Sequence, residues 1–213
     1  MGTFAQIAES RRSIRKYEDK DVDTHEILEC LRIATTAPSG CNSQCWKFML
    51  IHNKKKIADI ADLVTKKEKE LLSAVNMKYE QVYFDSRISM LTFFKNAPVC
   101  IAVYMTRLDY YDKKLEQALC EFGYTYDGLM ELFGFPDLLS VGAAIQNLLL
   151  ALSEKGYGAC WMNDPVIAKA EISQYLGMTS DEKLVSLIPV GIPAFTPKGK
   201  KYKDFNDVVK VIE

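Results

Sequence analysis

Two short polar segments near the start of the chain carry the residues best suited to chemistry. The first, Arg11-Arg12-Ser13-Ile14-Arg15, offers three guanidinium groups and a hydroxyl within five residues. The second, from Ala37 to Trp46, is a turn of small residues with amide and hydroxyl groups. Because a guanidinium pairs with phosphate oxygens through two parallel hydrogen bonds, the two segments together predict a phosphorylated ligand with a polar ring.

Each segment alone has a simpler interpretation. A basic cluster is commonly a solvated surface, and Pro-Ser-Gly is ordinary turn chemistry. The binding hypothesis therefore depends on both segments together and on a third element near residue 160. A purely structural or interaction role, with the basic ends as solvated surface, is the alternative.

Composition and charge set the broad class. The chain has 213 residues, 48% of them hydrophobic and 26% charged, which is typical of a globular protein with a substantial core. Its 27 basic and 28 acidic residues give a net charge of −1, so nothing favours binding to nucleic acid or a membrane. The start lacks a secretory signal pattern, and the apolar stretch from Leu148 to Leu152 is too short to span a bilayer. We expect a cytoplasmic protein with a single domain over residues 1–213.

Six cysteines lie at positions 30, 41, 45, 100, 120 and 160. None forms a Cys-x-x-Cys pair, and the chain has only two histidines, so no metal site is predicted. We expect most of the thiols to be reduced and buried. Cys41 and Cys45 flank the polar turn and are the two that could be reactive.

Hydrophobic periodicity predicts helices that alternate irregularly with about four short strands. Helical spacing marks residues 27–34, 57–64 with an exposed charged continuation at 66–70, and 141–152. Strands are expected at 46–51, 98–104, 157–162 and 184–192. Two helices in succession precede the strand at 98–104, which breaks a βαβ repeat and favours the α+β class.

Three further features of the sequence bear on the fold. Asp164-Pro165 predicts a helix N-cap followed by proline in the first turn, with Gly177 as the stop. The segment 108–135, crowded with aromatic and charged residues, is either helical cover that packs on a partner subunit or a pocket lid. No Gly-x-Gly-x-x-Gly turn or phosphate-binding loop is present, which disfavours the dinucleotide and triphosphate folds that use them.

Five segments together resemble the FMN-dependent nitroreductase family in order and spacing, across essentially the whole chain. They are residues 11–15, 37–46, 140–151, 156–162 and 190–193. The resemblance implies an α+β fold with a central, mainly antiparallel sheet flanked by helices. It also implies an interlocked homodimer with two FMN sites at the subunit interface.

The resemblance implies a set of cofactor-binding residues. Arg11 and Ser13 would contact the FMN phosphate, Arg15 would lie near N1 and O2 of the ring, and residues 38–42 would reach the ring from the partner chain. Residues 160–163 would pass the flavin and donate an amide hydrogen to N5. The whole set comprises Arg11, Arg12, Ser13, Arg15, Pro38, Ser39, Gly40, Asn42, Cys160, Trp161, Met162, Asn163, Lys198 and Lys200, with Lys201 as an alternative to the last two. Cys45 and Ser140 depart from the family pattern, which usually has Pro and often Asp there.

The activity that the resemblance implies is electron transfer from NAD(P)H to a nitroaromatic, quinone or similar small acceptor. Both substrates would use one open flavin face in a ping-pong mechanism. The flavin carries the chemistry, so no catalytic side chain is expected, and Arg15 would stabilise the charge of the reduced ring. The alternatives are a non-catalytic flavin sensor or storage protein and a relative specialised for reductive dehalogenation or flavin chemistry.

Overall fold

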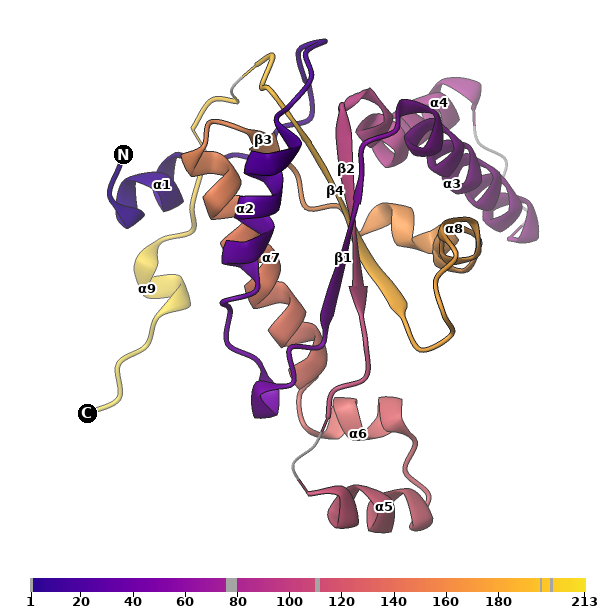
Figure 1. Ribbon diagram of the computed structural model, residues 1–213, viewed down its shortest axis with the longest axis vertical. Helices are drawn as coiled ribbons and strands as arrows, with labels where there is room; N and C mark the ends of the chain where they lie inside the picture. The colour runs from indigo at the N-terminus through magenta and orange to yellow at the C-terminus, as the bar shows by residue number, and fades with distance from the viewer. Residues whose placement is uncertain (1, 76–79, 110–111, 196, 200) are drawn as a thin grey trace.

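The computed structural model describes residues 2–75, 80–109, 112–195, 197–199 and 201–213. Its centre is a four-stranded antiparallel sheet with the spatial order β1-β2-β4-β3, which helices cover on both faces (Figure 1). The strands are β1 (Trp46–Ile51), β2 (Val99–Met105), β3 (Gly158–Ala159) and β4 (Lys183–Gly191). The predicted α+β class with a mainly antiparallel sheet is therefore confirmed.

Helices make up most of the remaining chain. They are α1 (Phe4–Ser10), α2 (Thr24–Ala34), α3 (Lys54–Ala74), α4 (Gln81–Thr92), α5 (Lys113–Glu121), α6 (Tyr126–Leu132), α7 (Pro136–Glu154), α8 (Lys169–Leu176) and α9 (Phe205–Val208). Three short 3₁₀ segments are η1 (Gly40–Asn42), η2 (Phe93–Asn96) and η3 (Asp164–Ala168).

The alternation of side chains along β2 divides the core into two layers. Val99, Ile101 and Val103 point into a cluster that includes residues of α2 and α7, whereas Cys100 and Tyr104 point into one formed with α3 and α8. Every residue of β2 is buried, as expected for a strand covered on both faces.

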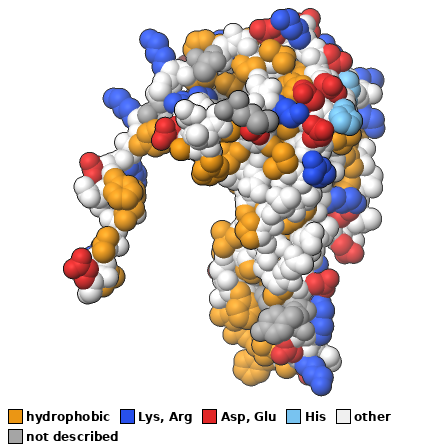
Figure 2. Space-filling view, turned by 60° about the vertical axis from the view of Figure 1, so that its left-hand side comes forward, with side chains coloured by type: hydrophobic (Ala, Val, Ile, Leu, Met, Phe, Trp, Pro, Cys, Tyr) orange, Lys and Arg blue, Asp and Glu red, His pale blue; other side chains and the backbone are white. Residues whose placement is uncertain are grey.

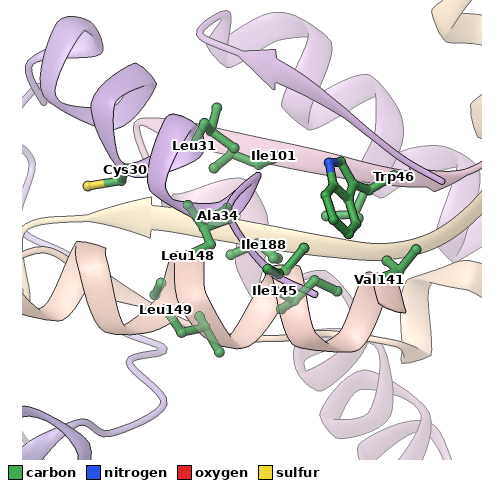
Figure 3. Packing of buried hydrophobic residues seen from close by; sticks show 14 of the residues in the cluster. Cys30, Leu31, Ala34, Trp46, Ile101, Val141, Ile145, Leu148, Leu149 and Ile188 are labelled. Carbon is green, nitrogen blue, oxygen red and sulfur yellow. The ribbon is translucent and has the colours of Figure 1, made fainter. Parts of the chain in front are cut away.

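The central helix α7 is the main element of the first layer. Its residues Val141, Ile145 and Leu148 pack against Trp46 of β1 and Ile188 of β4 (Figure 3). By length and composition alone α7 could cross a membrane, although half of that stretch is buried inside the molecule. Its apolar character is therefore used, on the buried face, for packing against the sheet and α2.

Several predicted elements differ from those observed. The strand expected at 157–162 is reduced to the two residues of β3 and an isolated bridge between Met162 and Leu187, because the chain leaves the ladder between them. Asp164 is the first residue of a 3₁₀ segment that precedes α8 and makes no capping bond, although Gly177 ends the helix as predicted, with φ +70°.

The charged continuation of α3 was predicted to be exposed, and for Glu68 this is wrong. Glu68 is 2% exposed and forms an ion pair with Arg87 of α4. Helix α4 packs on α3 and brings a cation to the carboxylate, which compensates its burial.

Candidate functional site

The arginine segment lies beside β3. Ser13 forms a parallel bridge with Ala159, and the N–H of Ile14 donates to the carbonyl of Ala159 at 3.0 Å. This approach depends on Gly158, because a Cβ atom there would lie 2.8 Å from the Ile14 side chain. The structure thus brings together two of the segments that were predicted to bind one ligand.

In the described part of the chain, no carboxylate neutralises the guanidinium groups of this segment. No Asp or Glu among the described residues forms an ion pair with Arg11, Arg12 or Arg15. The Nε atom of Arg11 is buried and has no hydrogen-bond partner in the described chain. Burial raises the pKa of the Cys160 thiol, and the nearby guanidinium groups of Arg15 and Arg11 act in the opposite direction. Positive charge is therefore held next to the 158–160 segment without an internal counter-ion.

The three arginines do not have equal freedom to bind a ligand. The Nη1 atom of Arg12 donates to the carbonyls of Glu9 at 2.5 Å and Arg11 at 2.8 Å, so it holds the loop that follows α1. Among the described residues, the Arg15 side chain forms one long hydrogen bond, from Nη1 to the Ser13 carbonyl at 3.5 Å. Arg11 and Arg15 are consequently the better candidates for direct contact with an anion.

A hollow of about 130 Å³ lies against Arg11 and Arg12. Its other walls are Ser10, Ile14, Leu149, Ser153, Gly156, Tyr157, Ala159 and Pro193. Sequence reasoning missed Ser153 and Tyr157 as possible contacts, because in the sequence they belong only to the end of a helix and the start of a strand.

The segment 160–163 crosses from β3 to the bridge with β4, and some of its polar groups are already bonded. Met162 exchanges two backbone hydrogen bonds of 3.0 Å with Leu187, and Nδ2 of Asn163 donates to the carbonyl of Val185 at 2.9 Å. The backbone N–H groups of Cys160, Trp161 and Asn163 have no carbonyl partner in the part of the chain that is described. These three amides, and not that of Met162, are therefore the ones that could donate a hydrogen bond to a ligand.

The polar turn at 38–42 lies at the other end of α7. The N–H of Gly40 donates to Oγ of Ser140 at 3.0 Å, near the start of the helix. The arginine hollow instead touches Leu149 and Ser153, nine to thirteen residues further along, which is about 14–20 Å of helix. A single chain therefore does not bring the two predicted halves of the site together.

A cavity of about 290 Å³ lies beside the turn. Gly40 and Cys41 of the turn line it together with Leu108, Asp112, Leu115, Glu116, Leu119, Leu129, Phe133 and Pro136. Its walls are mostly apolar, and the Glu116 carboxylate is paired with Arg107. Residues of α5 and α6 thus form part of the wall of this cavity, and the choice between helical cover and pocket lid for segment 108–135 stays a prediction.

Among the described residues, the lysines near the C-terminus that were predicted to bind phosphate have no hydrogen bond or ion pair that would fix them at a site. Lys198 and Lys201 are exposed, and Lys200 lies outside the described residues. Residues 201–213 are all exposed, and Figure 2 shows this terminal arm standing away from the body with hydrophobic side chains on its surface. The described residues also contain no cluster of three or more His, Cys, Asp or Glu that could hold a metal.

Comparison with known proteins agrees with the fold and the motifs. The sequence profile of the nitroreductase family matches residues 8–192. The chain belongs to the nitroreductase family. An iodotyrosine deiodinase of Thermotoga neapolitana is 24% identical over 194 residues, covering 91% of this chain and 90% of the relative.

Two solved structures extend the comparison. A BluB-like flavoprotein from Clostridium difficile 630 is 27% identical, has a TM-score of 0.85 and covers 100% of both chains. A nitroreductase with bound FMN from Desulfitobacterium hafniense is 19% identical, with a TM-score of 0.71 and 100% coverage of both chains, and shows the same fold.

Proposed function

We propose that this nitroreductase-family chain is an FMN-dependent oxidoreductase that passes electrons from NAD(P)H to nitroaromatic, quinone or similar small acceptors by a ping-pong mechanism. The observation that carries the proposal is the arginine segment, with its buried and unpartnered Arg11 Nε and no neutralising carboxylate in the described chain. A phosphate bound in the hollow would supply both the missing acceptor and the missing negative charge.

We further propose that FMN is held between two copies of the chain. One copy contributes Arg11, Ser13 and Arg15, and the other contributes residues 38–42. The distance between these groups along α7 supports this arrangement. Within one chain, the proposed phosphate site lies at one end of α7 and the proposed ring site lies at the other. The exposed apolar side chains of the arm, which include Phe205, Val211 and Ile212, are a further reason to expect a partner subunit.

FMN, when bound, supplies the hydride and electron chemistry. In this proposal the chain contributes position and charge. Arg15 places a cation where the reduced ring carries negative charge, and a free backbone N–H of the 160–163 segment offers a hydrogen bond to the ring edge. Lys198 and Lys200 or Lys201 remain proposed phosphate contacts, and a cytoplasmic location remains a prediction.

The apolar cavity beside the turn is the proposed site for the acceptor. Five large apolar side chains line it, which suits a flat uncharged ring. The similarity to an iodotyrosine deiodinase makes reductive dehalogenation of an aromatic ring the second candidate. Iodide release from iodotyrosine by the dithionite-reduced protein, compared with NAD(P)H oxidation in the presence of a quinone or nitroaromatic, separates the two activities.

The test of the proposed function is the double substitution Arg11→Ala and Ser13→Ala. The wild-type protein, reconstituted with FMN, should remain yellow through gel filtration and oxidise NAD(P)H when an acceptor is present. The variant should lose the flavin, because the two phosphate contacts proposed for the arginine segment are gone. Lys54→Ala, which removes an exposed cation at the start of α3, is the control and should retain FMN. Equal flavin retention by the double variant and the wild type would contradict the proposal.

A flavin sensor or storage protein would give a different result. It would bind FMN with the same dependence on Arg11 and Ser13, but it would turn over NAD(P)H negligibly with any acceptor. The turnover assay therefore distinguishes catalysis from binding.

A further inference from the structure

The turn that follows Ser39 has an unusual backbone. Cys41, Asn42 and Gln44 have φ angles of 53°, 52° and 47°, a region that residues other than glycine seldom adopt. Such conformations are costly and persist only where the surrounding structure imposes them.

Bonds within the turn account for part of this restraint. The N–H groups of Asn42 and Ser43 donate to the carbonyls of Ser39 and Gly40, both at 3.0 Å, and the N–H of Gln44 donates to Oγ of Ser39 at 3.0 Å. These bonds define the shape of the turn. They do not determine where the turn lies on the molecule.

Ser140 of α7 makes the bond that ties the turn to the helix. Its Oγ accepts from the N–H of Gly40 at 3.0 Å and donates to the carbonyl of Pro136 at 2.5 Å. The residue is only 4% exposed. Since the donated bond fixes the hydroxyl within the helix, an acceptor lone pair is left in place for Gly40.

The packing around Gly40 makes this bond possible. A Cβ atom at Gly40 would lie 3.1 Å from Cδ1 of Leu108 and 3.5 Å from Cβ of Pro136, so the lack of a side chain leaves the backbone close to Leu108 and to the start of α7. A second, weaker contact runs from Sγ of Cys45 to the carbonyl of Asp137 at 3.7 Å. The turn is therefore anchored on both sides to the first turns of one helix.

We propose that Ser140 is a positioning residue for the ring-binding turn. It does not reach the flavin; through the Gly40 amide it holds residues 38–42 in the place and shape that meet the ring of the partner subunit's site. The inference rests on the proposed function, because it requires the turn to lie at the flavin. It also gives a role to a position that the sequence marked only as a departure from the family pattern.

The test compares Ser140→Ala with Thr92→Val in the FMN-reconstituted protein. Both substitutions remove a buried hydroxyl that donates to the carbonyl four residues earlier, but Thr92 lies in α4, away from the turn. We expect S140A to bind FMN about tenfold more weakly, to alter the visible circular dichroism of the bound flavin and to speed amide exchange at Gly40. We expect T92V to leave all three unchanged, and Ser140→Thr, which keeps the hydroxyl, to restore binding.

The outcomes separate this inference from the proposed function. Wild-type affinity, flavin dichroism and Gly40 exchange in S140A would overturn the role of Ser140 while leaving FMN binding intact. A wild-type protein that binds no FMN would overturn both. If S140A is unstable, Ser140→Cys tests the same point, because it nearly preserves volume and offers only a weak acceptor.

Discussion

At the scale of single residues, the six cysteines divide sharply by environment. Cys41 and Cys120 are exposed, whereas Cys30, Cys45, Cys100 and Cys160 are buried, and all six are free thiols. Burial raises the pKa of Cys30 to about 11 and that of Cys100 to about 12, and it also raises the pKa of Cys45. Since the thiolate is the nucleophile, a raised pKa means that even less of it is present near neutral pH.

We therefore expect iodoacetamide at pH 8 to modify Cys41 and Cys120 in the native apoprotein and to spare the four buried thiols. FMN should slow the modification of Cys41, because the turn then faces the flavin, and it should leave Cys120 unchanged. Peptide mass spectrometry measures both sites in one sample, so Cys120 serves as the internal control. Equal rates at Cys41 with and without FMN would argue against a turn at the flavin.

The cysteines also show how far residue types alone can be interpreted. The sequence predicted mostly buried, reduced thiols and singled out Cys41 and Cys45 together as flanking the turn. Only Cys41 is accessible, because the chain enters β1 at Trp46 and turns the Cys45 side chain toward the start of α7. The backbone of Gln44, directly before Cys45, is left-handed with φ 47°, and no glycine in the sequence indicates such a conformation there.

At the scale of elements, two glycines next to the site differ in whether they have room for a side chain. A Cβ at Gly158 would lie 2.8 Å from Ile14, whereas at Gly142, inside α7, its nearest neighbour would be Trp161 at an ordinary 3.5 Å. We expect Gly158→Ala to lower the free energy of unfolding by about 1–3 kcal/mol and to weaken FMN binding, because the arginine segment must move away from β3.

The matched substitution Gly142→Ala should be neutral or stabilise by up to about 1 kcal/mol, since alanine is the better helix former. Urea unfolding of the apoprotein and FMN titration measure the two effects separately. Two glycine variants with the same stability and the same FMN affinity would contradict the close approach of the arginine segment to β3.

The elements that the sequence predicted well are those whose signal is local. The strand Trp46–Ile51 has the expected bounds, and β2 and β4 are each displaced by only one residue at each end, because branched apolar runs and flanking turns mark them. The length of β3 and the burial of Glu68 could not be predicted in this way. The first depends on where the chain leaves the ladder with β4 before Met162 bridges Leu187, and the second on Arg87 of α4, which lies opposite Glu68.

At the scale of the whole molecule, the separation of the two half-sites along α7 predicts complementation between inactive variants. One variant carries Arg11→Ala with Ser13→Ala, and the other carries Ser39→Ala with Asn42→Ala. In a mixed dimer one site combines both defects and the other has none. After joint unfolding and refolding of equal amounts, about a quarter of all sites should be intact.

Flavin binding and NAD(P)H oxidation measure this effect. Both should be recovered in the refolded mixture and absent from either variant alone. Each variant refolded by itself is the control. A mixture as inactive as its components would contradict sites shared between subunits. From the sequence, shared sites could be expected only through the family resemblance. The separation of the arginine segment from the polar turn along α7 becomes visible only in the folded structure.

The exposed arm has a consequence for how the protein comes into being. A newly made copy presents Phe205, Val211 and Ile212 to water from the moment it folds, and under the proposed dimer it does so until it meets a second copy. That meeting is a second-order event, so its half-time lengthens as the concentration of unassembled chains falls. At low expression, the time before two copies meet would determine how long the apolar side chains of the arm stay exposed and able to aggregate.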